Sequence, residues 1–357
     1  MADPLVEIKN LKVEFNVRDG VVQALDGVTY TVNRGKTIGV IGESGCGKSV
    51  TAKAVMQMVP KPGKITQGEV LYYHRDKRNR NAPIDVVNIT QLDPDGEKIR
   101  EIRGGEIGMI FQEPMSSLTP VYTTGLHISE ALNLHHLIPL TVGDTMANEI
   151  MKFRHVTKQE AREMSIEMLQ KVGLPKPTER VDAYPHQLSG GQRQRVMIAV
   201  ALSCSPAMLI ADEPTTALDV SIEAQILDLM RGLQETENMA IMFITHNLGV
   251  VAEMAEEMVV MYMGKQVETG SSQEIFYEPL HPYTEALLKS IPHIGKTHGT
   301  RLASIEGMTP DPFKLPPGCV FHPRCPRFME GKCDKIVPSW TKVADNRFVR
   351  CLLYEEV

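Results

Sequence analysis

The chain has 357 residues, of which 42% are hydrophobic and 23% charged, enough for one large domain or two ordinary ones with their own cores. Its 38 Lys and Arg residues against 44 Asp and Glu give a formal net charge of −6, which argues against an extended nucleic-acid-binding surface. The longest uncharged apolar stretch, Val196 to Ala211, is shorter than the roughly 20 residues of a membrane-spanning helix. The stretch Met1 to Glu14 does not form a secretory signal, so we expect a chain that does not itself cross a membrane.

The N-terminal segment predicts antiparallel strands. Alternating apolar residues from Val6 to Phe15 indicate one or two strands, Asp19 and Gly20 provide a turn, and a further apolar segment runs from Val21 to Tyr30.

Short apolar runs recur further along the chain, and their length is typical of strands buried on both faces of a largely parallel sheet. These runs are Thr37 to Ile41, Ile107 to Phe111, Met208 to Ala211 and Ile241 to Thr245. Ligands bind just beyond the carboxyl ends of such strands. We therefore expect the next residues, Gly42, Gln112, Asp212 and His246, to meet at one site.

The remaining segments predict the domain organisation. Ser129 to Gly173 has a helical composition, and Glu160 to Val172 carries an amphipathic pattern. Prolines recur from Pro279 to Pro326 and indicate an extended tail. The predicted organisation is a domain at 1–290, a helical subdomain inserted at about 113–195, and a small cysteine-rich extension at 291–357.

A glycine-rich loop follows the first of the buried runs. Gly42 to Ser49, GESGCGKS, matches the Walker A pattern, in which backbone N–H groups and the start of a helix surround a phosphate. Lys48 is placed to reach the β- and γ-phosphates and Ser49 to ligate Mg²⁺. The loop by itself predicts only a nucleotide-binding protein.

Acidic and polar residues at the other strand ends predict hydrolysis. Asp212 is expected to hold the magnesium ion through water, and Glu213 to act as general base on the attacking water. His246 is placed to hydrogen-bond the γ-phosphate, and Gln112 to complete the magnesium shell.

The segment Leu188 to Gln192, LSGGQ, is the most specific motif of the chain. Ser189 is expected to cap a helix that contains Val196, Ala199 and Val200. Its hydroxyl and the glycine N–H groups would form a second phosphate-binding surface, so that ATP could be held between two chains.

With these motifs the sequence resembles the ABC transporter ATPase family over roughly residues 5 to 290. The resemblance implies an α/β fold, a P-loop NTPase cassette with a mostly parallel sheet core, an N-terminal antiparallel β part and an inserted helical subdomain. It also implies an active ATPase that dimerises head to tail. The ATP contacts that it implies in cis are Phe15 (on adenine), Gly42, Ser44, Gly45, Cys46, Gly47, Lys48, Ser49, Val50 and Asp212, with catalysis by Glu213, His246 and Gln112. Those that it implies in trans are Ser189, Gly190, Gly191 and Gln192.

A narrower resemblance covers nearly the whole chain. The runs GESGCGK, FQEPMSSLTP and LPPGCVFHPRCP are similar to those of dipeptide/oligopeptide permease ATPases, although Thr119 stands where Asn is usual. The resemblance implies peptide import from the cytoplasmic face of the membrane. The partners implied are two membrane permeases, a second ATPase (a sister chain rather than an identical one), and, indirectly, an extracytoplasmic binding protein. The alternatives are another cargo, such as nickel chelates or oligosaccharides, or a soluble ABC protein without a transport role.

The C-terminal cysteines Cys319, Cys325, Cys333 and Cys351 lack the spacing of common zinc sites and of bacterial ferredoxins. Their density in a short tail predicts one metal centre. The resemblance implies a [4Fe-4S] cluster; structural zinc, and disulfides or free thiols, are the alternatives.

Overall fold

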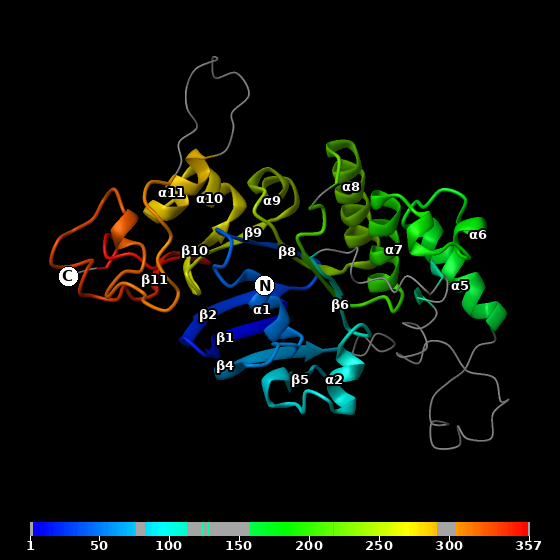
Figure 1. The fold of residues 1–357 in the computed structure, drawn as a ribbon, viewed down its shortest axis with the longest axis horizontal. Coiled ribbons are helices and arrows are strands. Elements are labelled where there is room, and N and C mark those ends of the chain that lie inside the picture. Colours follow the sequence, from blue (N-terminus) through cyan, green and yellow to red (C-terminus); the bar gives the residue numbers. More distant parts are fainter. Residues whose placement is uncertain are drawn as a thin grey trace, which may run out of the picture. The chain divides into compact units, whose positions relative to one another are not determined.

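The computed structural model describes residues 3–75, 83–112, 158–216, 218–290 and 305–355, and residues 123, 124, 127 and 128. The chain forms two compact units (Figure 1). Unit 1 consists of residues 1–92 and 242–357, and unit 2 of residues 93–241. Both ends of the chain therefore build unit 1, and the middle of the chain builds unit 2.

Unit 1 contains the predicted antiparallel sheet, with strand order β2-β1-β4-β5. Its strands are β1 (Pro4–Val17), β2 (Gly20–Asn33), β4 (Gly63–His74) and β5 (Asp85–Asn88). β1 and β2 form a hairpin around the expected turn, with Val17 opposite Gly20. Ile8 and Leu11 are both fully buried although they are three positions apart, because a bulge with Asn10 at φ 46° shifts the strand register between them.

Unit 1 also contains five neighbouring strands of a second sheet, in the order β11-β12-β10-β9-β3. These strands are β3 (Thr37–Ile41), β9 (Glu257–Tyr262), β10 (Lys265–Ser271), β11 (Thr341–Ala344) and β12 (Arg347–Val349). β3 is buried along its whole length and pairs in parallel with β9, as its continuous apolar sequence predicts. The other pairs are antiparallel, and β12 joins the end of the chain to β10.

The helices of unit 1 are short. They are α1 (Lys48–Val55), α9 (Leu248–Met254), α10 (Ser272–Tyr277) and α11 (Pro282–Lys289), with the 3-10 turns η1 (Ile89–Gln91) and η3 (His322–Arg324). An aromatic cluster joins η3 to the sheet and to α11, because the ring of Phe321 lies 5.2 Å from that of Tyr262 and 5.4 Å from that of Tyr283. The start of the cysteine-rich segment thus belongs to the core of unit 1.

Unit 2 pairs β6 (Ile107–Ile110) in parallel with β7 (Met208–Asp212), and both strands are fully buried. Its other elements are α2 (Glu97–Ile102), α5 (Lys158–Lys171), α6 (Pro177–Arg180), η2 (Pro185–Gln187), α7 (Gly190–Leu202) and α8 (Val220–Glu237). Gly108 lets α7 approach β6 closely, since a Cβ there would lie 2.5 Å from the carbonyl oxygen of Ala201. The chain passes back into unit 1 within β8 (Ala240–Ile244).

The amphipathic pattern over Glu160 to Val172 corresponds to α5. Most of the expected helical subdomain between 113 and 157 lies outside the described residues, as does Thr119. Within the part that is described, no helix has both the length and the apolar character needed to span a bilayer.

Candidate functional site

The glycine-rich loop connects β3 to α1 in unit 1. Its glycines adopt left-handed backbone angles, with φ of 149° at Gly42, 79° at Gly45 and 104° at Gly47, the N-cap of α1. A Cβ on Gly42 would lie 2.2 Å from the carbonyl oxygen of Met261, so the close passage of β9 requires glycine at this position. The loop therefore forms the expected strand–loop–helix structure.

Lys48 spans the inside of this loop. Its Nζ donates to the carbonyl oxygens of Gly42 at 2.7 Å and Glu43 at 3.1 Å, and lies 3.8 Å from Cys46 Sγ. Lys48 and Cys46 are buried, Ser49 and Val50 are half-buried, and the tip of the loop at 44–45 is exposed. The ammonium group is thus held where a phosphate oxygen could replace its two carbonyl partners.

Unit 2 brings two of the predicted catalytic residues together at the ends of parallel strands. Gln112 follows β6 and Glu213 follows β7, and Gln112 Nε2 lies 3.4 Å from Glu213 Oε2. The hydroxyl of Thr216 donates to the same carboxylate oxygen at 2.9 Å. Asp212, the last residue of β7, is buried. Glu213 has a left-handed backbone (φ 49°), which marks it as a strained position.

Phe15 and His246 lie on other elements of unit 1. His246 is exposed just beyond β8, where Asn247 caps α9. Phe15 is half-buried on β1, and its ring covers Gly63, where a Cβ would come within 2.6 Å of the ring carbon Cε1. Phe15 was predicted to lie on a strand and His246 just beyond the end of one, and the structure agrees with both.

Ser189 caps α7, as predicted. Its Oγ accepts a hydrogen bond from the Gln192 N–H at 3.4 Å, and Gln192 Oε1 accepts one from the Ser189 N–H at 3.2 Å. Gly191 allows contact with α8, because a Cβ there would lie 2.8 Å from Ile222, whereas a Cβ on Gly190 would meet nothing. The start of α7 thus offers an accessible backbone held by a capping box.

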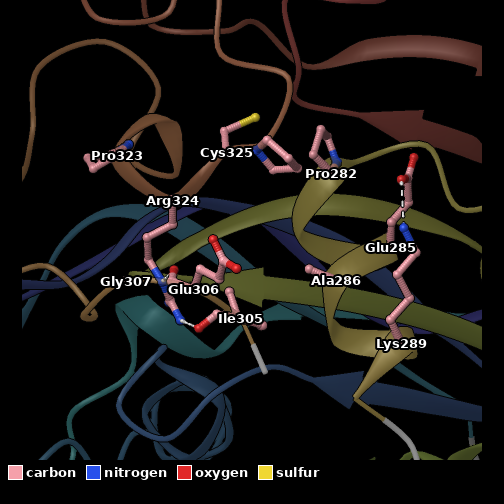
Figure 2. A pocket seen from close by; sticks show the side chains of 11 residues that line it. Pro282, Glu285, Ala286, Lys289, Ile305, Glu306, Gly307, Pro323, Arg324 and Cys325 are labelled. Atoms are coloured by element: carbon pink, nitrogen blue, oxygen red, sulfur yellow. Dashed lines mark hydrogen bonds and ion pairs between the residues drawn. The ribbon is translucent and has the colours of Figure 1, made fainter. Parts of the chain in front are cut away.

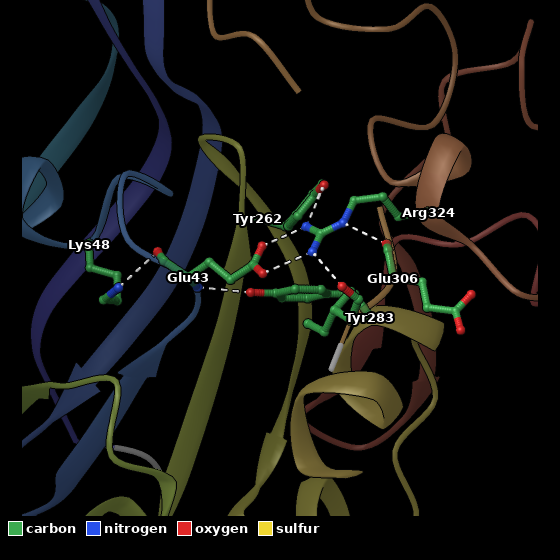
Figure 3. A network of polar contacts seen from close by, with 7 residues as sticks. Glu43, Lys48, Tyr262, Tyr283, Glu306 and Arg324 are labelled. Carbon is green, nitrogen blue, oxygen red and sulfur yellow. Dashed lines mark hydrogen bonds and ion pairs between the residues drawn. The ribbon is translucent and has the colours of Figure 1, made fainter. Parts of the chain in front are cut away.

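Sequence reasoning missed four residues that support these motifs. In unit 2, the buried Gln194 donates from Nε2 to the carbonyl of Pro214, the residue after Glu213. In unit 1, Figure 3 shows Tyr283, Tyr262 and Arg324 around the loop residue Glu43. No local pattern connects position 324 to position 43; only the fold brings them together.

The cysteines of the C-terminal segment line one small cavity beside His281 and Phe321; they are Cys319, Cys325, Cys333 and Cys351. The cavity measures about 10 Å³, roughly the room for one water molecule. Burial raises the pKa of Cys319 and Cys325, and that of Cys351 to about 12, and none of the four cysteines forms a disulfide. Among the residues described, no three or more Cys, His, Asp or Glu side chains are arranged to hold a metal ion. The expected iron–sulfur cluster is therefore not supported.

A larger cavity, of about 500 Å³, lies between α11 and the segment that carries η3 (Figure 2). Pro282, Glu285, Lys289, Ile305 and Arg324 are among the residues that line it. It contains none of the residues predicted to bind nucleotide. Arg324 connects the two regions, since it lines this cavity and extends its guanidinium group to Glu43 (Figures 2 and 3).

The chain is similar to known proteins over nearly its whole length. A family model described as ABC transporter matches residues 25–216, and one described as oligopeptide/dipeptide transporter, C-terminal region, matches residues 267–333. The oligopeptide transport ATP-binding protein AppD of Bacillus subtilis (strain 168) is 45% identical over 353 residues, which cover 99% of this chain and 97% of AppD. The dipeptide transport ATP-binding protein DppD of Escherichia coli (strain K12) is 41% identical, with 97% and 96% covered. The dimeric structure of MJ0796, a bacterial ABC transporter cassette, superimposes with a TM-score of 0.59 at 26% identity and covers 75% of this chain and 99% of its own.

Proposed function

Because the chain belongs to the ABC transporter family, we propose that it is the ATP-hydrolysing subunit of an importer for dipeptides or oligopeptides. The observation that carries the ATPase function is the loop of unit 1, in which Lys48 Nζ is held 2.7 Å from the Gly42 carbonyl at the start of a helix. The cargo is supported by the relatives named for peptide transport and by the match of the C-terminal region.

In this proposal the loop binds the phosphates of ATP. Lys48 exchanges its two carbonyl partners for oxygens of the β- and γ-phosphates, while the N–H groups of the loop, from Gly42 to Val50, surround them. Phe15 stacks on the adenine ring. Ser49, Gln112 and Asp212 would hold Mg²⁺, which supplies charge neutralisation at the phosphates when it is bound.

Hydrolysis needs a water molecule in line with the γ-phosphate. Glu213 accepts the proton of that water, and Gln112 and Thr216 orient its carboxylate, since both lie within hydrogen-bonding reach of Oε2. His246 donates to the γ-phosphate and keeps the water in register with Glu213. Release of phosphate and then of ADP returns Lys48 to its contacts with the carbonyls of Gly42 and Glu43.

The second half of each nucleotide site comes from another ATPase subunit in trans. Ser189, Gly190, Gly191 and Gln192 of one subunit contact the γ-phosphate bound by the other. In the capping box Ser189 Oγ accepts the Gln192 N–H, so its own proton remains available for a phosphate oxygen. We infer that the second subunit is a sister chain.

The proposed partners are two membrane permeases, on whose cytoplasmic side the ATPases dock, and an extracytoplasmic solute-binding protein that selects the cargo. Purification of tagged Glu213→Gln with ATP from its native membranes tests this assembly. Two multispanning proteins and a second ATPase should co-purify with the variant. In the complex purified with the wild-type chain, addition of a peptide-binding protein should stimulate ATP hydrolysis. If the chain is isolated alone, or with nucleic acid, the proposed import function is refuted, whereas the proposed ATPase activity is not.

Nickel chelates and oligosaccharides are the alternative cargoes. They are distinguished by which solute, added with the binding protein, stimulates hydrolysis by the complete complex.

We also propose that Cys319, Cys325, Cys333 and Cys351 hold a metal. The support is that four thiols share one cavity, which is a suitable donor set for zinc or iron. The space of about 10 Å³ does not fit a [4Fe-4S] cluster without separation of the four chain segments, whereas a single Zn²⁺ ion requires a smaller rearrangement.

A further inference from the structure

Glu43, the second residue of the phosphate-binding loop, is anchored through three of its groups (Figure 3). Its N–H donates to Tyr283 Oη at 2.9 Å, and its carbonyl accepts a hydrogen bond from Lys48 Nζ at 3.1 Å. Its carboxylate accepts two bonds from Arg324, from Nη1 at 2.8 Å and from Nη2 at 3.1 Å. The loop is therefore tied both to α11 and to the C-terminal segment.

Arg324 is held as firmly as the glutamate that it binds. Its side chain is 4% exposed, and its guanidinium carbon lies 5.9 Å from the centre of the Tyr262 ring. Nε donates to the carbonyl of Glu306 at 3.2 Å, Nη1 to Tyr262 Oη at 3.3 Å and Nη2 to the carbonyl of Ile305 at 3.4 Å. These contacts fix a planar fork in the one orientation that fits a carboxylate.

The negative charge of Glu43 affects nucleotide binding because this residue lies within the phosphate-binding loop. A carboxylate within a phosphate-binding loop repels the phosphates, and the repulsion is strong where solvent is partly excluded. The Arg324 guanidinium cancels this charge without occupying the inner side of the loop, where Lys48 lies. The pair thus removes an electrostatic penalty on nucleotide binding and restricts the motion of the loop.

We propose that Arg324 is a positioning residue of the phosphate-binding loop, through which the C-terminal cysteine-rich segment sets the affinity for nucleotide. The inference rests on the proposed ATPase function. It assigns to the end of the chain a role in the nucleotide site that none of the sequence motifs predicts.

The test measures equilibrium binding of a non-hydrolysable ATP analogue with Mg²⁺ to the full-length chain. Arg324→Gln should bind on the order of tenfold more weakly, because Glu43 is left charged and unpaired. Arg327→Gln is the matched control, since it removes another ion pair of the same segment, with Glu285 at 2.6 Å, and should bind as wild type does. The double variant Glu43→Gln/Arg324→Gln should recover affinity to within about threefold of wild type, because the repelling charge is gone.

Recovery by the second substitution separates this role from a merely structural one. If the segment only supports the fold, removing both partners cannot restore binding. Thermal unfolding without nucleotide checks each variant, and Arg324→Lys, which keeps the charge but loses the fork, replaces Arg324→Gln if that variant does not fold; it should bind about threefold more weakly than wild type.

Two results would overturn the inference: wild-type affinity in Arg324→Gln (or in its Lys replacement), or a double variant no better than the single one. A wild-type chain that binds no nucleotide would instead refute the proposed function itself.

Discussion

The side-chain amide of Gln112 lies 3.4 Å from the carboxylate of Glu213, which places the ends of β6 and β7 in direct contact within unit 2. Glu213 is also the residue at which the chain turns through a left-handed conformation between the buried Asp212 and Pro214. The carboxylate therefore has a defined orientation before any nucleotide binds. This preorganisation suits a group that must orient a water molecule.

Glu213→Gln should reduce ATP hydrolysis by at least about 100-fold while ATP binding is retained, because the amide keeps the shape of the side chain but cannot accept the proton of water. Steady-state phosphate release and equilibrium nucleotide binding measure the two effects. Glu235→Gln, an exposed substitution on α8, is the control and should hydrolyse ATP at the wild-type rate. Turnover of Glu213→Gln within about tenfold of wild type, well below the roughly 100- to 10,000-fold contribution of a general base, would contradict the assignment.

Lys48→Ala should weaken ATP binding on the order of 100-fold, since the phosphates lose a charged donor and the loop loses its ties to the Gly42 and Glu43 carbonyls. Lys48→Arg keeps the charge and should lose less affinity. Nucleotide titration of both variants tests this, and equal affinities for Lys48→Ala and wild type would exclude Lys48 from phosphate binding.

Gln194→Leu should lower the free energy of unfolding by about 1–3 kcal/mol, because the buried carbonyl of Pro214 loses its donor. Chemical denaturation measures the loss, and the turnover number should fall with it because Pro214 follows Glu213. Gln170→Leu, at an exposed position of α5, should change stability by no more than about 0.5 kcal/mol. A Gln194→Leu variant with unchanged stability would show that water replaces the lost donor.

Acid should destabilise unit 1 through His281. Burial lowers the pKa of His281 to about 3, and its Nδ1 accepts the Tyr283 N–H at 3.0 Å to cap α11. Below the ordinary pKa of about 6.5 the unfolded chain binds a proton that the folded chain does not, so stability falls as pH decreases from about 6.5 to about 3. The contribution approaches about 1.4 kcal/mol for each pH unit.

His281→Asn isolates this contribution, because asparagine also caps helices but does not titrate. The difference in unfolding free energy between wild type and variant should shrink steadily below pH 6.5. Glu268 faces the same helix start, and burial raises its pKa, but it titrates in both proteins and cancels in the difference. A difference that does not depend on pH would contradict the prediction.

The chain purified without oxygen should contain one metal centre, and Cys319→Ser should lose it, because four thiols share one cavity. Zinc, iron and labile sulfide are the analyses to make. Cys204→Ser, which removes a buried thiol of unit 2, should keep the metal. If the purified wild-type protein contains no metal, the prediction is wrong and the four cysteines only pack in the core.

Much of the fold follows from local patterns. The run Thr37 to Ile41 coincides with β3, and the run Met208 to Ala211 with all but the last residue of β7. Both are short, continuous apolar segments, followed by Gly42 and by Asp212, so their burial on two faces is visible in the sequence. Ser189 is predicted as a cap because it is a serine that precedes a helical pattern with apolar residues at Val196, Ala199 and Val200, and the structure confirms it.

The contacts that support the site were not predictable in the same way. The pair Arg324–Glu43 and the bond from Gln194 to Pro214 join segments that are distant in sequence, and neither has a characteristic spacing. The cysteines show a different error. The resemblance implied a [4Fe-4S] cluster, but the cavity that the four thiols line is too small for one.

The antiparallel pairing of Glu268 with Val349 has a consequence for the synthesis of the protein. Until residues 347–349 leave the ribosome, the outer edge of β10 has no partner strand, and an open edge can pair with another chain. Pairing of β12 therefore covers the edge of β10, and the short strand β11 becomes the outer strand of the sheet. Chains that stop early would be expected to accumulate as insoluble material even with every motif of the ATPase intact.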